Sequence, residues 1–326
     1  MSQVPPTQDR PARLSPDEQG IARACDLLEQ GELVALPTET VYGLGADARN
    51  DQACAKIFEA KGRPTFNPLI VHVADLAQVA QIAEVTDTAR ILADRFWPGP
   101  LTLVLRLRPD HGLSPLVSAG LPTVAIRIPN HPVAQNILRR FGGPIAAPSA
   151  NRSGRLSPTS AEHVARSLGN RIAAIVDGGP CPVGLESSIV DASQKPAKLL
   201  REGGIAREEI SALTGALVSD LTPGRVAAPG QMSSHYAPNA PLRINQDLSD
   251  PTRLRIAFGP IGDADFTLSE KGDLREAAAA LFSILHHADA ELALRGKTGI
   301  DVAPVPQKGL GLAINDRLMR AAAPRD

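Results

Sequence analysis

The sequence has few cysteines, and none is placed for a disulfide or a zinc site. Cys25, Cys54 and Cys181 are odd in number, far apart and without C-x-x-C spacing, which argues against a disulfide framework. The seven histidines include no H-x-x-x-H pair and no H-E-x-x-H run. We therefore expect no metal bound by protein side chains, and a reducing compartment suits the three thiols.

Net charge and long apolar runs are also scarce. The 34 basic side chains nearly balance the 35 acidic ones, for a formal charge of -1, so no global field recruits nucleic acid or an anionic membrane. No long uncharged apolar stretch occurs, and the segment from Met1 to Arg13 is polar and rich in proline. We expect neither a membrane span nor a signal peptide, and hence a cytoplasmic protein.

Several common active-site signatures are missing. The sequence contains no G-x-x-x-x-G-K-[ST] run, and no G-x-S-x-G surrounds Ser149, which disfavours a P-loop and a serine hydrolase. Gly43-x-Gly45-x-x-Ala48 only superficially matches a dinucleotide fingerprint, because residues 37–42 separate it from the preceding strand. The glycines are interpreted as residues that let the backbone turn, and the nucleotide site is expected elsewhere.

What the sequence does contain is ordinary globular composition and two alternating periodicities. With 326 residues, 43% hydrophobic and 21% charged, the chain is long enough for two domains. Helical spacing alternates with short apolar runs, which predicts a mixed α/β fold. Predicted helices cover residues 15–30, 51–60, 88–96, 132–140, 273–289 and 311–322, and predicted strands cover residues 33–36, 69–73, 101–107, 124–128, 144–147, 173–176, 254–258 and 299–305. The alanines of residues 277–280 are interpreted as helix filler.

Composition divides the chain into four parts. Residues 1–14 are expected to form a disordered head, and residues 15–214 a mixed α/β domain. Residues 215–238 lose periodicity and contain Pro-Gly pairs, which predicts a linker. Residues 239–326 are expected to form a smaller α/β domain.

Two short polar segments are candidates for chemistry. Lys61 and Arg63 flank Gly62 at the predicted end of a helix, where two cations on a shaped loop suit phosphate oxygens. Ser149 and Asn151 follow an apolar strand, the place where ligands usually bind an open α/β sheet. Each pattern alone also fits a purely structural role: charges that complement the helix dipole in the first case and an ordinary turn in the second.

Taken together, the motifs resemble a known family. They are Pro37 to Gly45 (PTETVYGLG), Lys61 to His72 (KGRPTFNPLIVH), Trp97 to Thr102 (WPGPLT), Ala147 to Asn151 (APSAN), His235 to Pro238 (HYAP) and Gly309 to Arg317 (GLGLAINDR). Their order resembles that of two-domain L-threonylcarbamoyladenylate synthases. The resemblance implies a twisted mixed-sheet YrdC-like catalytic domain and a smaller Rossmann-like α/β C-terminal domain.

The resemblance also implies an activity and a set of site residues. The family forms threonylcarbamoyl-AMP and pyrophosphate from L-threonine, bicarbonate and ATP, with Mg²⁺ carried by ATP, and other proteins then transfer the threonylcarbamoyl group to a tRNA adenosine beside the anticodon. Lys61 and Arg63 would be catalytic, beside the phosphates. Contacts to ATP would come from Arg63, Asn67, Thr123, Ser149, Asn151, Thr159, Arg201 and Tyr236, and contacts to threonine from Thr40, His72, Arg127 and Ser187.

The residue chemistry agrees with this assignment. Arg127 can clamp an α-carboxylate, while Thr40, His72 and Ser187 offer hydroxyl and imidazole partners. The linker from Pro229 to Pro238 is expected to cover the pocket as a lid. The alternative hypothesis is a module that binds double-stranded RNA or tRNA without synthase activity, through local basic residues such as Arg152, Arg155 and Arg166.

Overall fold

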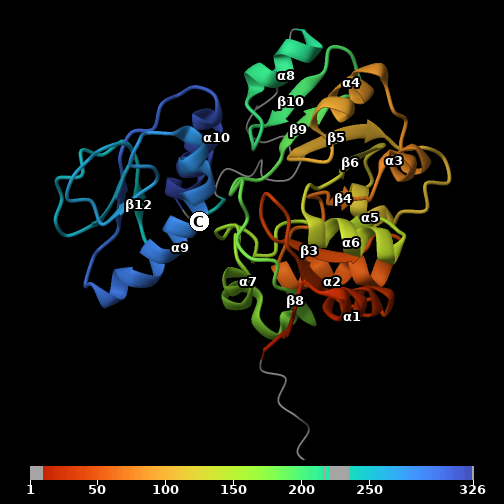
Figure 1. Cartoon of the computed structure of the whole chain (residues 1–326), viewed down its shortest axis with the longest axis horizontal. Coiled ribbons are helices and arrows are strands. Elements are labelled where there is room, and N and C mark those ends of the chain that lie inside the picture. Colours follow the sequence, from red (N-terminus) through yellow and green to blue (C-terminus); the bar gives the residue numbers. More distant parts are fainter. Residues whose placement is uncertain (1–9, 216–217, 220–234, 325–326) are drawn as a thin grey trace, which may run out of the picture.

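The computed structural model describes residues 10–215, 218–219 and 235–324 and shows two packed α/β units (Figure 1). The larger unit is built on an 11-stranded mixed sheet, with the order β1-β8-β2-β3-β7-β4-β6-β5-β9-β10-β11. Its strands are β1 (Ala12–Leu14), β2 (Val34–Leu36), β3 (Gly43–Asp47), β4 (Ile70–His72), β5 (Leu101–Arg106), β6 (Thr123–Arg127), β7 (Ile145–Ala146), β8 (Ala174–Val176), β9 (Ser188–Asp191), β10 (Lys198–Arg201) and β11 (Val218–Ser219). This arrangement confirms the mixed α/β fold.

Helices cover the two faces of the large sheet unequally. They are α1 (Glu18–Glu29), α2 (Asp51–Lys61), α3 (Leu76–Ile82), α4 (Asp87–Phe96), α5 (Pro115–Ser118), α6 (Pro132–Phe141), α7 (Ala161–Leu168) and α8 (Arg207–Thr214), with a 3₁₀ turn at Gly169–Arg171. Residues of α2, α4, α5 and α7 pack with Ala35, Val71 and Ala146 in the main core. Residues of α1 and α6 pack with Val34, Leu36 and Ile145 on the opposite face.

Strand register shows that α1 and α6 cover only part of that second face. His72 of β4 lies opposite both Ile145 of β7 and Arg127 of β6, and residues directly opposite on neighbouring strands share a face. The face packed by α1 and α6 therefore continues over β4, β6, β5, β9 and β10. There it carries a small apolar cluster of Ile70, Val104, Ala125, Ile189 and Leu200, of which Ile70 lines the candidate site.

Local sequence signals set the helix ends, and the start of α1 differs from the prediction. Helix α2 begins after Asn50, whose side chain accepts from the backbone of Gln52 and Ala53, and ends at left-handed Gly62, as expected from the sequence. Helix α1 is capped by Asp17 and not by Ser15, which instead donates to the Asp17 carboxylate. Helix α7 is likewise capped by Ser160. The Asp17 carboxylate is a stronger acceptor than the Ser15 hydroxyl, and α1 therefore begins later than the predicted start at residue 15.

The interpretation of Gly43 and Gly45 as turn residues is wrong. Both lie in β3, which pairs antiparallel with β2. A Cβ on Gly45 would lie 3.0 Å from Cδ1 of Leu36, and one on Gly43 would lie 3.2 Å from Cβ of Ala147. The glycines are needed because neighbouring strands leave no room for side chains there, which is the other common reason for glycine in a strand.

Ordered structure begins and ends differently from the predicted head and linker. Residues 12–14 pair with β8 as an edge strand and lie inside the predicted head; the two apolar residues Ala12 and Leu14 give too little periodicity to predict a strand. Residues 1–9 of that head lie outside the described residues. In the predicted linker, β11 pairs with β10, while residues 216–217 and 220–234, which include most of the expected lid, also lie outside them.

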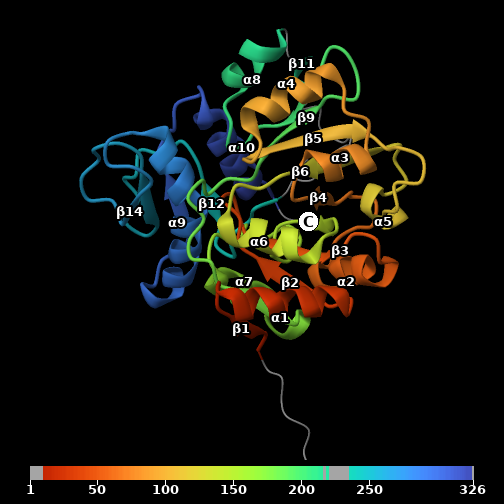
Figure 2. The ribbon, with the colours of Figure 1, turned by 45° about the vertical axis from the view of Figure 1, so that its right-hand side comes forward.

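The smaller unit contains a four-stranded parallel sheet with the order β12-β15-β13-β14. Its elements are β12 (Leu242–Arg243), β13 (Leu254–Ala257), β14 (Phe266–Thr267), α9 (Leu274–Leu294), β15 (Ile300–Val302) and α10 (Leu310–Ala322). Figures 1 and 2 show these elements, in blue, together on one side of the larger unit. A parallel sheet packed with α9 and α10, of which α9 connects β14 to β15, confirms the Rossmann-like α/β character of the C-terminal domain.

The two units approach each other at their main chains. Gly184, with φ of +70°, precedes β9 in the larger unit, and a Cβ built on it would lie 2.5 Å from Cα of Ala279 in α9. The alanine run is therefore a contact surface as well as helix filler. No helix among the described residues is long and apolar enough to cross a membrane.

Candidate active site

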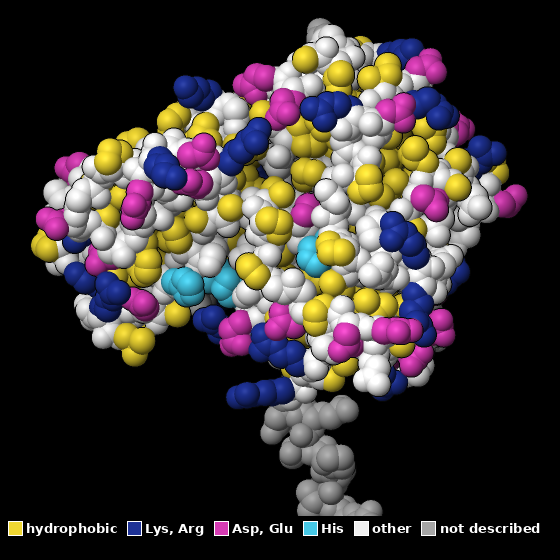
Figure 3. All heavy atoms as spheres, viewed as in Figure 1, with side chains coloured by type: hydrophobic (Ala, Val, Ile, Leu, Met, Phe, Trp, Pro, Cys, Tyr) yellow, Lys and Arg dark blue, Asp and Glu magenta, His cyan; other side chains and the backbone are white. Residues whose placement is uncertain are grey.

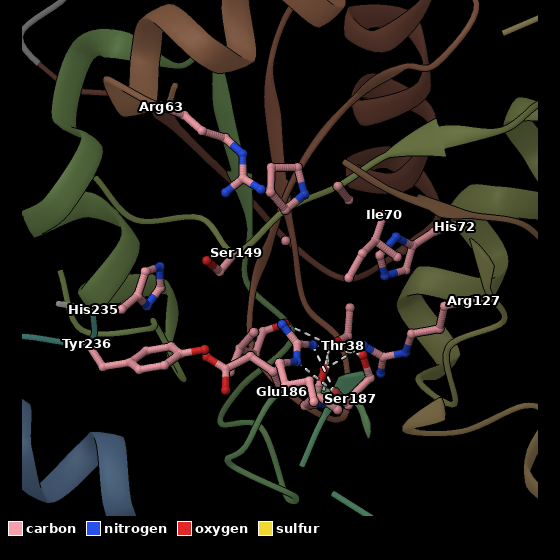
Figure 4. A pocket seen from close by; sticks show the side chains of 16 residues that line it. Thr38, Arg63, Ile70, His72, Arg127, Ser149, Glu186, Ser187, His235 and Tyr236 are labelled. Carbon is pink, nitrogen blue, oxygen red and sulfur yellow. Dashed lines mark hydrogen bonds between the residues drawn. The ribbon is translucent and has the colours of Figure 1, made fainter. Parts of the chain in front are cut away.

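A pocket lies above the part of the large sheet that α1 and α6 do not cover, where several loops and strand ends converge. It is lined by Thr38, Thr40, Val41, Gly43, Arg63, Ile70, His72, Arg127, Ala147, Pro148, Ser149, Glu186, Ser187, Arg201, His235 and Tyr236. Figure 4 shows Arg63, Ser149 and Tyr236 on one side and His72 and Arg127 on the other. Eight of the thirteen residues predicted from the sequence are therefore brought together in one pocket.

Arg127 organises the end of the pocket at the β6 terminus. Its Nη1 donates to Oγ1 of Thr40 at 2.7 Å and its Nε to the carbonyl of Gly99 at 3.2 Å. Its Nη2 lies 2.7 Å from Oε1 of Glu39, and both side chains of this ion pair are about 5% exposed. A guanidinium has five N–H groups in a rigid fork, so a fixed Arg127 retains donors for the carboxylate of a small ligand.

Ser187 connects the same end of the pocket to Arg201. Its Oγ lies 2.7 Å from Oγ1 of Thr102 and accepts from Nη2 of Arg201 at 3.1 Å. Arg201 also donates from Nε and Nη2 to the Ser187 carbonyl. Since Ser187 immediately precedes β9 and Arg201 ends β10, the antiparallel pairing of these strands holds both residues in place.

His72 is buried beside Arg127 and remains neutral. Burial, with the nearby charge of Arg127, lowers the pKa of His72 to about 3. Its Nδ1 has no hydrogen-bond partner among the described residues. A neutral imidazole with an unused nitrogen can donate to or accept from a ligand hydroxyl, depending on its tautomer.

Arg63, Ser149 and Tyr236 line the opposite side. Arg63 follows left-handed Gly62, and its guanidinium donates to the carbonyls of Asn67 and Pro68. Burial and the charge of Arg201 lower the pKa of Arg63 to about 10, so the guanidinium is still a cation at neutral pH. Tyr236 is fully buried with φ of 60°, an uncommon conformation for a large residue and one that often marks a functional site.

Lys61 lies just behind the pocket and supports its wall. Its Nζ donates to the carbonyls of both Ser149 and Asn151, at 2.5 Å each. Burial, and secondarily the charge of Arg63, hold its pKa well below the usual range. The amine therefore fixes the backbone of the loop that presents Ser149, and an anion bound nearby would favour its protonated form.

The remaining predicted residues do not line the pocket. Asn67 and Asn151 are buried, and their Oδ1 atoms have no partner among the described residues. Thr159 contacts Nδ1 of His163. Thr123 begins β6 on the same face as Arg127, four residues away. The side chains of these four residues are therefore not part of the pocket lining.

Sequence reasoning missed several lining residues. Thr38 and Val41 were inside a quoted motif, and Thr38 Oγ1 bonds both Thr40 and the Val41 carbonyl. His235 was also within a motif but was given no role. Glu186 carried no signal except its place beside Ser187, and its carboxylate accepts from Ser157 at 2.5 Å and from Arg317 at 3.0 Å. That second partner comes from α10, which sequence spacing could not have brought here.

The charge of the pocket favours an anionic ligand. Three arginines line it against one carboxylate, that of Glu186. Although burial alone would raise the pKa of Glu186, the charges of Arg317 and Arg201 hold it below the usual value. The described residues contain no group of three or more His, Cys, Asp or Glu that could hold a metal ion.

Two buried histidines, His72 and His163, and the half-buried His286 predict a stability that depends on pH. Burial lowers the pKa of His72 and His163 to about 3 and that of His286 to about 4, so each is neutral in the fold but takes up a proton below about pH 6.5 when unfolded. Lowering the pH from 7 to 4 should therefore reduce the free energy of unfolding, by up to about 1.4 kcal/mol per pH unit for each histidine.

Urea denaturation at a series of pH values measures this slope. His163→Asn should make the slope shallower, whereas His111→Asn, a change in a partly exposed loop, should leave it unchanged. A free energy of unfolding that stays constant between pH 7 and pH 5 would contradict the assignment of neutral buried histidines. Figure 3 shows histidines, in cyan, near the boundary between the two units. The rings of His163 and His286 stack with centroids 3.8 Å apart.

Comparison with known proteins identifies the family. Residues 26–203 match the model of the Sua5, YciO and YrdC family, described as telomere recombination, and residues 205–323 match the model described as the threonylcarbamoyl-AMP synthase C-terminal domain. The threonylcarbamoyl-AMP synthase of Bacillus subtilis is 44% identical, covering 96% of this chain and 95% of that protein. The one from Pyrococcus abyssi is 41% identical, covering 95% and 96%.

A solved structure agrees with these matches. The crystal structure of P. abyssi Sua5, described as complexed with L-threonine, superposes with a TM-score of 0.85 at 38% identity and covers 95% of this chain and 97% of that one. The comparisons do not favour the alternative of an RNA-binding module without synthase activity. The order of the motifs, the two-unit fold and these matches lead to one conclusion: the chain belongs to the threonylcarbamoyl-AMP synthase family, in its two-domain form.

Proposed function

We propose that the pocket joins L-threonine, bicarbonate and ATP into threonylcarbamoyl-AMP and releases pyrophosphate. The observation that carries this proposal is the pairing of two different polar ends in one cavity. One end has Arg127, Thr40, His72 and Ser187, and the other has Arg63, Ser149, Arg201 and Tyr236. The first set suits a hydroxylated amino acid, and the second suits a nucleotide with its phosphates.

At the amino-acid end, Arg127 binds the threonine α-carboxylate. Thr40 and Glu39 already fix its guanidinium, so little side-chain entropy is lost when the ligand binds. His72 and the Ser187 hydroxyl are the partners for the threonine hydroxyl and amine. A site that hydrogen-bonds a substrate hydroxyl rejects analogues without it far better than an apolar site does.

At the nucleotide end, arginines and the Lys61 loop neutralise the phosphates. Arg63 and Arg201 face the phosphate region, while Lys61 holds the Ser149 loop and becomes cationic as phosphate approaches. Asn67, Thr123, Asn151 and Thr159 stay predicted ATP contacts. The Mg²⁺ comes with ATP, since the only carboxylate that lines the pocket among the described residues, that of Glu186, is already bonded to Ser157 and Arg317. The ion would supply further neutralisation of phosphate charge.

The reaction requires positioning more than a protein nucleophile. The neutral threonine amine attacks the bicarbonate carbon, a bicarbonate C–O bond breaks, and the hydroxyl leaves as water with a proton from the amine, which gives the carbamate. A carbamate oxygen then attacks the α-phosphorus of ATP, a phosphorus–oxygen bond to the β-phosphate breaks, and pyrophosphate leaves. Holding the carbamate and ATP in one pocket converts this second step into an effectively unimolecular one. The product is then available to proteins that transfer the threonylcarbamoyl group to tRNA.

The proposal is tested by incubating the full chain with ATP, Mg²⁺, ¹⁴C-bicarbonate and L-threonine. We expect a labelled adenylate in equal amount to the pyrophosphate released, because both products arise in one step. Omitting threonine should abolish pyrophosphate release. L-Valine, which has the shape of threonine without its hydroxyl, serves as the matched control and should support less than about 1% of the rate. Pyrophosphate release that is independent of threonine would refute the proposed reaction.

A further inference from the structure

Arg317 is a charged residue in the middle of an apolar helix face. Helix α10 buries Ala313, Ile314, Leu318 and Ala321 against the smaller unit, and Arg317 lies on the same buried side with an exposed fraction of 0%. A buried guanidinium requires compensating partners, because moving an unpaired charge out of water costs far more than an apolar side chain gains. The partners of Arg317 therefore indicate what the residue does.

Those partners lie largely in the active site of the larger unit. Its Nε donates to Oε2 of Glu186 at 3.0 Å, and its guanidinium carbon lies 5.3 Å from the centre of the Tyr236 ring. The neighbouring Asp316 accepts from its Nη1 at 2.9 Å. Glu186 and Tyr236 both line the pocket, so one side chain of the C-terminal domain contacts two lining residues from different segments of the chain.

The segment around Glu186 leaves little freedom for its carboxylate. Oε1 accepts from Ser157, and the main-chain carbonyl of Glu186 accepts from the backbone of Gly204. Figure 4 shows the Tyr236 side chain directed toward Glu186, with Ser187 beside it. A carboxylate held at the wall of a nucleotide pocket would repel a triphosphate unless a cation neutralised it. Arg317 and, across the pocket wall, Arg201 are the cations whose charges act on it.

We propose that Arg317 is a positioning residue of the adenylylation site, by which the C-terminal domain completes the ATP pocket. Its contact with Glu186 neutralises the one acidic side chain in the lining, and its contact with the Tyr236 ring fixes the residue that enters from the end of the interdomain segment. The inference rests on the proposed synthesis of threonylcarbamoyl-AMP. It gives the C-terminal domain a role in binding ATP that is separate from the threonine end.

A double-mutant cycle tests the inference in the full chain. Arg317→Met leaves the Glu186 charge without its partner, and we expect kcat/KM for ATP to fall about 100-fold, chiefly through KM. The KM for threonine should change less than about 3-fold. Glu186→Gln, which keeps an acceptor for the Ser157 hydroxyl, should lower kcat/KM for ATP about 5-fold. Because Glu186→Gln removes the negative charge that Arg317→Met leaves unpaired, kcat/KM for ATP of the double variant should recover to within about 3-fold of that of Glu186→Gln alone.

Controls separate this role from a structural one. Arg275→Met replaces an exposed arginine on α9 of the same domain and should leave all constants unchanged, while Arg317→Lys should retain part of the ATP affinity. Melting temperatures are recorded for every variant, and the double variant keeps the test valid if Arg317→Met alone is unstable. Additive losses in the cycle, or equal losses in the two KM values, would overturn the inference. A wild-type chain that forms no adenylate would instead refute the proposed function.

Discussion

Replacing Arg127 by Met should lower kcat/KM for threonine by about 1,000-fold, while ATP binding in the absence of threonine changes little. The substitution removes the cation proposed to hold the α-carboxylate and also leaves the buried Glu39 without its ion-pair partner. Truncating one member of a buried, hydrogen-bonded charge pair costs about 2–5 kcal/mol. Steady-state pyrophosphate release at varied threonine measures the loss, and calorimetry with a non-hydrolysable ATP analogue measures ATP binding.

Two further variants make the Arg127 result interpretable. Glu39→Gln combined with Arg127→Met removes both charges, so the fold should recover while threonine binding should not. Arg106→Met, an exposed arginine on the neighbouring strand β5, is the matched control and should behave as the wild type. Wild-type use of threonine by the folded double variant would show that the carboxylate is bound elsewhere.

Lys61→Met is expected to have the second large effect, a loss of pyrophosphate release of about 100- to 1,000-fold at saturating substrates. The substitution keeps most of the side-chain volume but removes the amine. Two consequences follow from the geometry, because the amine donates to Ser149 and Asn151 and lies beside Arg63. The phosphates lose a cation, and two buried carbonyls lose their donor, which costs about 1–3 kcal/mol of stability for each.

Lys56→Met provides the comparison for Lys61. Lys56 lies on the same helix α2 and also donates to a main-chain carbonyl, that of Gly31, but far from the pocket. We expect the Lys56→Met variant to be somewhat less stable than the wild type but fully active. Quenched-flow measurement of pyrophosphate release reports the chemical step for both variants, and urea denaturation reports their stability. If Lys61→Met turns over like Lys56→Met, Lys61 has only the structural role.

Much of the fold follows from local pattern. The periodicity of residues 51–60 and the glycine at 62 predict α2 to within one residue, because a capped amphipathic helix is decided by its own sequence. The order of the strands, by contrast, does not follow from local sequence. That β4 lies between β7 and β6, and β5 next to β9, depends on contacts between residues far apart in the chain, for which short apolar runs carry no information.

The residues of the site likewise include some that local motifs predict and some that depend on contacts between distant segments. Lys61, Arg63, Ser149 and Asn151 are close in two short motifs, and the family pattern adds Arg127, Arg201 and Tyr236, which the structure places at one pocket or directly behind it. Glu186 and Arg317 could not be paired from the sequence, since 131 residues separate them and each alone is a common charged residue. The wrong interpretation of Gly43 and Gly45 has the same origin, because the atoms that exclude a Cβ belong to other strands.

The close approach of Gly184 to α9 has a consequence for how the two domains change over evolution. A Cβ on Gly184 would meet the Cα of Ala279 and the carbonyls of Ala278 and Ala279 at 2.5 to 2.6 Å. Contact made by main-chain atoms cannot be relaxed by choosing a different rotamer on either side. In the two-domain form, a substitution on one side of this contact must therefore be matched by the domain on the other side. A chimaera that exchanges the C-terminal domain between relatives must keep both the glycine and the small residues opposite it, whatever else in the interface differs.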